Sequence, residues 1–226
     1  MSQILVCANL GGIDPIWPLP SHQVDLQSVY YTDKGLDEDM PSALTWDRFL
    51  SLPEHPNPRL AAKFYKCQIH RLDSTADAER LVWCDSAFRF SSLEFLERDY
   101  GKCAMFVPHP DRMSVAEEYE YVLRQVEQGN PYLSARYDPG PLEAERDYFS
   151  RRHKLASLPL WCGGLWSVPR TEAAYRFLDS WWDIVQRFSI LDQTSLTPLL
   201  VEAGLEVEPL DVSIYRSPWF ERVHHA

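Results

Sequence analysis

The 226-residue sequence has no apolar run long enough to span a bilayer. Its first residues, MSQILVCANLGG, lack the basic segment of a signal peptide and are typical of a β-strand that leads into a turn. The five cysteines are odd in number and show no C-x-x-C spacing, so we expect buried free thiols in a reducing compartment. These absences predict a soluble, cytoplasmic protein.

Basic residues are also scarce: 22 lysines and arginines stand against 33 acids, and the net charge is −11. A charge of this sign repels phosphate backbones on average, which disfavours broad nucleic-acid binding but leaves room for a local basic groove. Apolar residues make up 45% of the chain and charged residues 24%, as in globular proteins. We expect a single domain over residues 1–226.

Common catalytic motifs are missing as well. The sequence has no G-x-S-x-G, H-E-x-x-H, Walker A or G-x-G-x-x-G pattern. Each cysteine stands in an apolar run, where thiolate formation is disfavoured, so a cysteine nucleophile is not expected.

Short strands that alternate with helices are what the sequence does contain. Strands are predicted in QILVCA, QSVYYTD, RLVWC, KCAMFVP and LEVEPLD. Helices are predicted at 58–70, 91–101, 115–127, 171–188 and 192–204. We expect irregular connections at 34–58 and 130–145, and a strand, glycine turn and second strand in LPLWCGGLWSVPR.

This alternation predicts an α/β fold with a mostly parallel sheet flanked by helices. Ligands bind such sheets at the carboxyl ends of the strands, where Asp33 and Asp85 are expected. Taken alone, each aspartate could equally be a turn residue.

Seven segments in this order resemble one known family: YYTD, PRLAAKFYK, LVWCDSAFRF, PHPDRMSVAEE, LPLWCGGLWSVPR, SWWDIV and LDQTSL. They are similar to the glycosyltransferase-like family of plant turgor-regulation-defect and mucilage-related proteins, over roughly residues 28–211. The resemblance implies a GT-A-like (Rossmann-like) fold. It also implies transfer of a sugar from a UDP-, GDP- or CDP-sugar donor to a hydroxyl acceptor on a glycan, a small molecule or a protein.

The resemblance implies that Asp85 corresponds to the family's carboxylate that binds Mn²⁺ or Mg²⁺ next to the donor diphosphate. The usual D-x-D pattern has Trp83 here in place of its first acid. A divalent cation would neutralise the charge that builds up on the departing nucleoside diphosphate.

Arg59, Lys63 and Lys66 share one face of the predicted helix at 58–70 and match the family's basic stretch. They are predicted to bind the donor diphosphate, and Asp33 the base or ribose. For the three basic residues the alternative is an ordinary solvent-exposed helix face, and for Asp33 it is a plain turn.

The segment PHPDRMSVAEE places His109 and Arg112 between a strand and a helix, where they could reach the sugar or the phosphates. Glu117 is expected to close a capping box with Ser114, and a functional part for Glu117 or Glu118 is the alternative.

Sugar or acceptor binding is expected at Gly163, Gly164, Trp166 and Gln193. Glycines allow close backbone approach, and indole rings stack on sugars. The alternatives are a tight hairpin for the glycines and core packing for Trp166.

Asp192 and Gln193 match the family's D-Q pair, although Leu191 replaces the preceding arginine. Asp192 is predicted to be the general base in an inverting reaction, or to position the substrates in a retaining one. A helix N-cap is its structural alternative.

Three further hypotheses remain open. A hydroxymethylated DNA base could be the acceptor if Arg146, Arg151, Arg152 and Lys154 formed a basic groove. A non-catalytic module could bind sugar nucleotides or glycans on the same fold. The terminal His224 and His225 could join a metal site, although a frayed end is expected there.

Overall fold

One continuous sheet of seven strands organises the computed structural model, which describes residues 2–12, 14–34 and 45–223. The strands follow the order β3-β2-β1-β4-β7-β6-β8 across the sheet. Their bounds are β1 Gln3–Asn9, β2 Leu26–Thr32, β3 Arg48–Ser51, β4 Arg80–Cys84, β6 Ala104–Pro108, β7 Trp161–Pro169 and β8 Val207–Pro209.

Most neighbouring strands in this sheet run parallel. The pairs β1–β2, β2–β3, β1–β4 and β6–β8 are parallel, whereas β7 runs antiparallel between β4 and β6. The order 3-2-1-4 of the first four strands matches the first four positions of the Rossmann order 3-2-1-4-5-6. The predicted α/β fold with a mostly parallel sheet is therefore confirmed.

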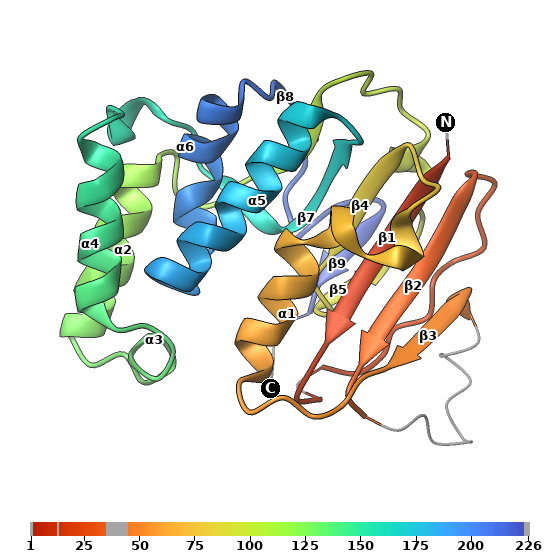
Figure 1. Ribbon diagram of the computed structural model, residues 1–226, viewed down its shortest axis with the longest axis horizontal. Helices are drawn as coiled ribbons and strands as arrows, with labels where there is room; N and C mark the ends of the chain where they lie inside the picture. Colours follow the sequence, from red (N-terminus) through yellow and green to blue (C-terminus); the bar gives the residue numbers. More distant parts are fainter. Residues whose placement is uncertain (1, 13, 35–44, 224–226) are drawn as a thin grey trace.

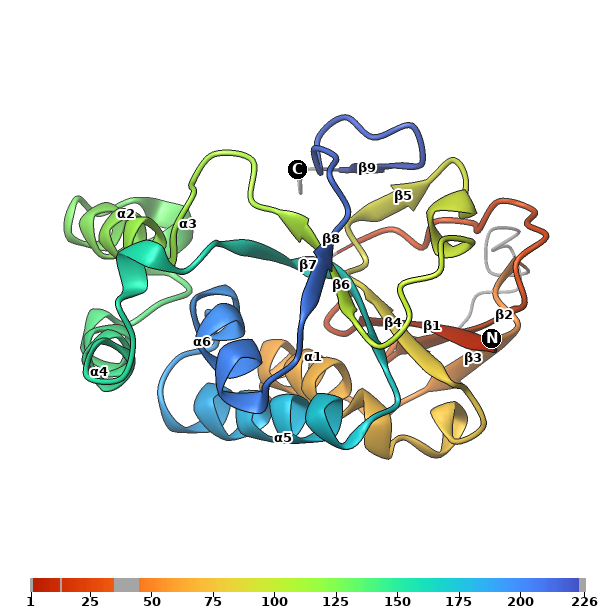
Figure 2. The same cartoon turned by 90° about the horizontal axis from the view of Figure 1, so that it is seen from above.

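Helices cover one face of the sheet (Figures 1 and 2). Three lie there, α1 Pro58–Cys67, α5 Glu172–Arg187 and α6 Gln193–Ala203. The opposite face carries the two-stranded sheet of β5 Phe88–Phe90 and β9 Phe220–Arg222. Along β1, Ile4 and Val6 enter the core under the helices, and Leu5 and Cys7 enter the core on the other face.

A second group of helices, α2 Val115–Glu127, α3 Pro131–Ser134 and α4 Pro139–Ser150, stands beside α6 at one side of the molecule (Figures 1 and 2). The sequence predicts α2 but not α3 or α4, because Pro131 and Pro139 suggest an irregular segment. Each proline instead occupies the first helical turn, behind a capping Asn130 or Asp138. The expectation of an irregular connection at 130–145 was therefore wrong.

Two other predicted elements differ from the structure. Residues 91–101 form a short 3₁₀ turn, Glu94–Leu96, rather than a helix, because Phe95 packs against Phe90 and Phe220. The predicted hairpin at 158–170 is the single strand β7, whose two glycines adjoin a shift of register against β6. Strand β3 was missed in the expected irregular connection, and β5 and β9 were missed as well.

The predicted free thiols are confirmed at all five cysteines, four of them buried. Among the described residues, no helix is long and apolar enough to cross a membrane.

Candidate active site

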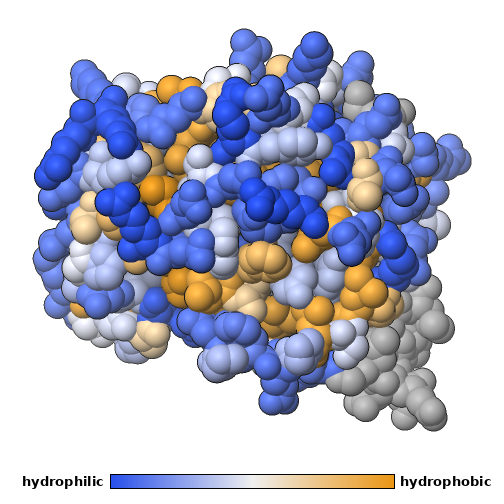
Figure 3. All heavy atoms as spheres, in the orientation of Figure 1, coloured by the Kyte–Doolittle hydropathy of each residue, from blue (hydrophilic) through white to orange (hydrophobic). Residues whose placement is uncertain are grey.

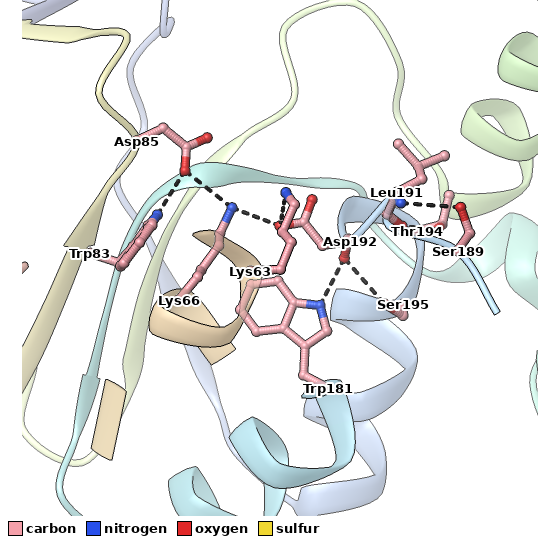
Figure 4. A network of polar contacts seen from close by, with 10 residues as sticks. All are labelled: Lys63, Lys66, Trp83, Asp85, Trp181, Ser189, Leu191, Asp192, Thr194 and Ser195. Atoms are coloured by element: carbon pink, nitrogen blue, oxygen red, sulfur yellow. Dashed lines mark hydrogen bonds and ion pairs between the residues drawn. The ribbon is translucent and has the colours of Figure 1, made fainter. Parts of the chain in front are cut away.

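Asp85 directly follows β4 and faces a cavity. Its backbone N–H donates to the carbonyl of Gly164 at 2.7 Å, which ties the end of β4 to β7. The Oδ1 atom accepts a hydrogen bond from Trp83 Nε1 at 2.7 Å and lies 3.3 Å from Lys66 Nζ (Figure 4). The side chain is still 41% exposed. Contacts to Trp83 and Lys66 thus fix the carboxylate of Asp85, while part of it remains open to the cavity. A residue that served only the turn would need neither feature.

Asp192 precedes α6, but its side chain makes no capping hydrogen bond. Its Oδ2 atom instead lies 2.7 Å from both Lys63 Nζ and Lys66 Nζ. The backbone carbonyl of Asp192 accepts hydrogen bonds from Trp181 Nε1 at 2.9 Å and Ser195 Oγ at 3.1 Å (Figure 4). The N-cap alternative is therefore wrong, because the carboxylate points toward the lysines of α1.

Lys66 joins the two carboxylates. Its side chain is only 2% exposed, so the alternative that Lys66 belongs to a solvent-exposed basic helix face is wrong. Burial lowers the pKa of Lys66, but Asp192 and Asp85 outweigh that effect and raise it above its usual range. The ammonium therefore stays charged and balances the acids beside it.

The same contacts keep both aspartates ionised. Burial raises the pKa of Asp192, yet Lys63 and Lys66 outweigh burial and hold this pKa well below its usual range. At the partly exposed Asp85, partial desolvation raises the pKa, but Lys66 and Lys63 outweigh this effect and lower it. A carboxylate held by two ammonium groups is a weak general base, so the geometry favours the positioning role for Asp192.

Two adjoining cavities open at this network. The first, of about 180 Å³, lies at the carboxyl ends of β1 and β4 and the start of α1. The second, of about 320 Å³, extends toward α2 and α6. Both are lined by Lys63, Lys66, Asp85, Arg136, Tyr137 and Arg222.

The second cavity brings together the predicted residues of the segment after β6. Arg112 forms a salt bridge with Glu118, and Gln193 Nε2 donates to Glu118 Oε1 at 3.1 Å. His109 Nδ1 accepts hydrogen bonds from the backbone N–H groups of Asp111 and Arg112, both at 3.1 Å. Burial and the positive charge of Arg112 lower the pKa of His109 to about 4, so the ring is neutral at pH 7.

Glu117 has the structural role that the sequence favours. The hydroxyl of Ser114 accepts from the Glu117 N–H at 3.3 Å, and the Glu117 carboxylate accepts from the backbone N–H of Met113 at 2.9 Å. The carboxylate reaches one residue beyond the N-cap that a capping box would use.

Gly163 and Gly164 line the second cavity at the point where β7 passes the two aspartates. A Cβ on Gly164 would lie 2.8 Å from Phe88 Cε2 and 3.0 Å from Asp85 Oδ2. A Cβ on Gly163 would have no contact under 3.5 Å. Close backbone approach is thus required at Gly164.

Two predicted residues lie away from both cavities. The carboxylate of Asp33 accepts two hydrogen bonds from the Gly11 N–H, at 2.9 and 2.8 Å, and so braces the loop after β1. Trp166 is fully buried among Trp83, Phe106 and Trp181, which fits its core alternative. Neither side chain is placed to contact a ligand in the cavities.

Of the residues that line both cavities, three were missed in the sequence: Arg136, Tyr137 and Arg222. Arg136 and Tyr137 follow α3 in a stretch expected to cross the surface, and Arg222 lies on the unpredicted strand β9. No local pattern marks them, because only the tertiary fold brings these segments to β4. Arg59 was predicted, and it lines the first cavity.

The described residues do not supply a complete set of protein ligands for a divalent cation. They contain no group of three or more His, Cys, Asp or Glu residues placed to hold a metal. Asp85 Oδ1 is already taken by Trp83 and the ammonium of Lys66. His224 and His225 lie outside the described residues. The role of Asp85 in binding Mn²⁺ or Mg²⁺ therefore stays a prediction.

No protein-family model and no curated protein matches this sequence. Among solved structures, the chain is similar to mouse xyloside xylosyltransferase 1 in its apo form, at 11% sequence identity. The match covers 93% of this chain and 85% of the other, with a TM-score of 0.48. At this similarity, the function has to be argued from the site itself, and the resemblance to the plant family stays a prediction.

Proposed function

We propose that this chain is a glycosyltransferase that moves a sugar from a nucleotide-diphosphate-sugar donor to a hydroxyl acceptor. The observation that supports this most is the position of the first cavity, at the carboxyl ends of β1 and β4 in a sheet of Rossmann-like order. Asp85 lines this cavity, and its partly exposed carboxylate forms an ion pair with Lys66. A glycan, a small molecule or a protein hydroxyl is the proposed acceptor.

The two cavities suit two substrates. We assign the donor to the first cavity and the acceptor to the second, because Asp85, Lys63 and Lys66 line both and so mark the point where the substrates would meet. In this arrangement Asp85 accepts hydrogen bonds from sugar hydroxyls. Asp192 fixes the lysines, and Gln193 and Arg112 face the acceptor from the second cavity.

The chemistry asked of the protein is positioning and charge stabilisation. Bringing donor and acceptor together in a fixed geometry lowers the barrier, and cationic groups stabilise the departing diphosphate. Neither effect needs a covalent intermediate or a strongly basic side chain, which agrees with the low pKa of Asp192.

A thermal-shift panel of UDP, GDP, CDP and their sugars, with and without Mn²⁺, tests donor binding. We expect one nucleotide class to raise the melting temperature, because a ligand that binds only the folded state stabilises it. The proposal fails if no nucleotide or nucleotide sugar stabilises the protein.

Hydrolysis of the bound donor in the absence of acceptor then tests catalysis. We expect Asp85→Asn to lower this hydrolysis by about 100-fold or more, since it removes a charge aimed at the reacting sugar. The melting temperature should change little, because Lys66 keeps its contact with Asp192. Full activity in this variant would show that Asp85 is not part of the catalytic site.

A non-catalytic module that binds sugar nucleotides is the second candidate. It is favoured by the tight pairing of Asp192 with two lysines, which leaves no strong general base beside Asp85. Donor binding without any measurable hydrolysis, by the wild-type protein, would select this candidate.

A further inference from the structure

Three arginines from separate parts of the chain line the first cavity. Arg59 lies in the first turn of α1, Arg136 follows α3 and Arg222 ends β9. Each side chain is partly buried. Among the described residues, none of the three forms an ion pair with a carboxylate. The Arg136 side chain donates a hydrogen bond to the Tyr132 hydroxyl and lies over the Tyr132 ring.

The two lysines of the same cavity are in a different position. Lys63 and Lys66 are paired with Asp192, and Lys66 also with Asp85, so their charges are already balanced. An anionic ligand gains little from lysines that already serve two carboxylates. The positive charge that no carboxylate balances in this cavity therefore belongs to the arginines.

The surroundings make this concentration of positive charge costly without an anion. Burial and the charges of Arg59 and Arg222 lower the pKa of Arg136, so Arg136 lies close enough to both arginines to be repelled by them. Helix α1 adds the partial positive charge of its N-terminus, and its first turn contains no acid. In a chain of net charge −11, this cluster is a local exception.

We propose that Arg59, Arg136 and Arg222 form the binding site for the diphosphate group of the donor, and that they neutralise its charge without a divalent cation. Guanidinium groups suit this ligand, because each can bind two phosphate oxygens with parallel N–H donors. The proposal rests on the proposed function for the identity of the ligand, but the anion site itself follows from the arginines.

Calorimetric binding of inorganic pyrophosphate to the full chain tests this site. We expect binding in the presence of EDTA, and a loss of affinity of about 10-fold or more in Arg136→Gln and in Arg222→Gln, since each removes a charge-assisted hydrogen bond. Arg151→Gln is the matched control, because Arg151 is exposed and lines neither cavity. Circular dichroism and melting temperatures establish that each variant is folded.

The outcomes separate this inference from the proposed function. Pyrophosphate binding that requires Mn²⁺, or that is unchanged in both arginine variants, overturns the arginine site. If a nucleotide sugar still binds and is hydrolysed in that case, the proposed function stands. If pyrophosphate binds through the arginines in EDTA but no nucleotide sugar binds, the anion site stands and the glycosyltransferase proposal fails.

Discussion

Lys66 is the residue on which the site depends most. It is buried against Trp83 and Trp181, with its Nζ 5.9 and 5.6 Å from the ring centres, and it contacts both aspartates. Removing Lys66 is costly, because both aspartates then lose the buried cation that they share.

We expect Lys66→Met to lower the free energy of unfolding by about 3–5 kcal/mol, the usual cost of an uncompensated buried charge. Lys63→Met is the matched control, since Lys63 is 22% exposed and Asp192 keeps its contact with Lys66. Urea denaturation of both variants measures the difference. Equal losses would show that Lys66 has no special place in the network.

Glu145 is a second buried acid, in α4, and it contacts the helix that carries the site. Its Oε1 atom accepts hydrogen bonds from Tyr119 at 2.8 Å and from Thr194 at 2.7 Å, and Thr194 lies two residues after Asp192. Burial raises the pKa of Glu145 to about 8, so the side chain is mostly neutral at pH 7.

The pH dependence of stability follows from that raised pKa. Below about pH 4.3 the glutamate is protonated in both the folded and unfolded chains. Between there and pH 8 only the unfolded chain releases the proton, so this residue's contribution to the free energy of unfolding falls by up to about 1.4 kcal/mol per pH unit. In Glu145→Gln we expect that slope to be shallower, as measured by urea denaturation from pH 5 to 8. An unchanged slope would contradict a neutral Glu145.

At the scale of elements, β7 decides the shape of the site. It runs continuously past both aspartates, and its register against β6 shifts between Phe106 and Val107. The two glycines in this strand have different surroundings, although they are neighbours in the sequence.

We expect Gly164→Ala to displace Asp85 or the ring of Phe88 and to lower donor hydrolysis, because its Cβ would lie within 3.0 Å of both side chains. Gly163→Ala is the control, since the nearest atom to its Cβ is Lys66 Nζ at 3.5 Å. Steady-state hydrolysis and melting temperatures of the two variants form the comparison. If Gly163→Ala proves the more damaging, the assigned path of β7 past Asp85 is wrong.

Element boundaries show where sequence patterns succeed. The strands β1, β4 and β6 contain continuous apolar runs, and β2 is rich in β-branched and aromatic residues. Helix α5 repeats its buried residues at helical spacing, so all five elements were predicted. Residues 91–101 also contain apolar side chains but form no α-helix, because packing against β5 and β9 decides their backbone. Local propensity does not contain that information.

At the scale of the whole molecule, the acidic charge bears on the choice of acceptor. Hydrophilic side chains cover most of the face shown in Figure 3, with apolar ones gathered mainly in its lower half. The residues of the hypothetical basic groove, Arg146, Arg151, Arg152 and Lys154, line neither cavity, and Arg146 is paired with Asp147.

We therefore expect no retention on duplex DNA containing hydroxymethylated bases at about 150 mM salt, because the net charge of −11 repels the phosphate backbone. Filter binding across a salt series measures this. Retention that weakens steeply with salt, and that is lost in Arg151→Glu, would support the DNA acceptor.

The sequence by itself determined the α/β class and the main strands and helices, because those depend on local apolar spacing and caps. Together with the family resemblance, it also pointed to Asp85, Asp192 and the basic face of α1. Their surroundings are visible only in the tertiary structure: Lys66 is buried between two acids, Asp192 does not cap its helix, and Arg136 and Arg222 reach the same cavity. The physical reason is that ion pairing and burial depend on atoms brought together from distant segments, which spacing along the chain cannot encode.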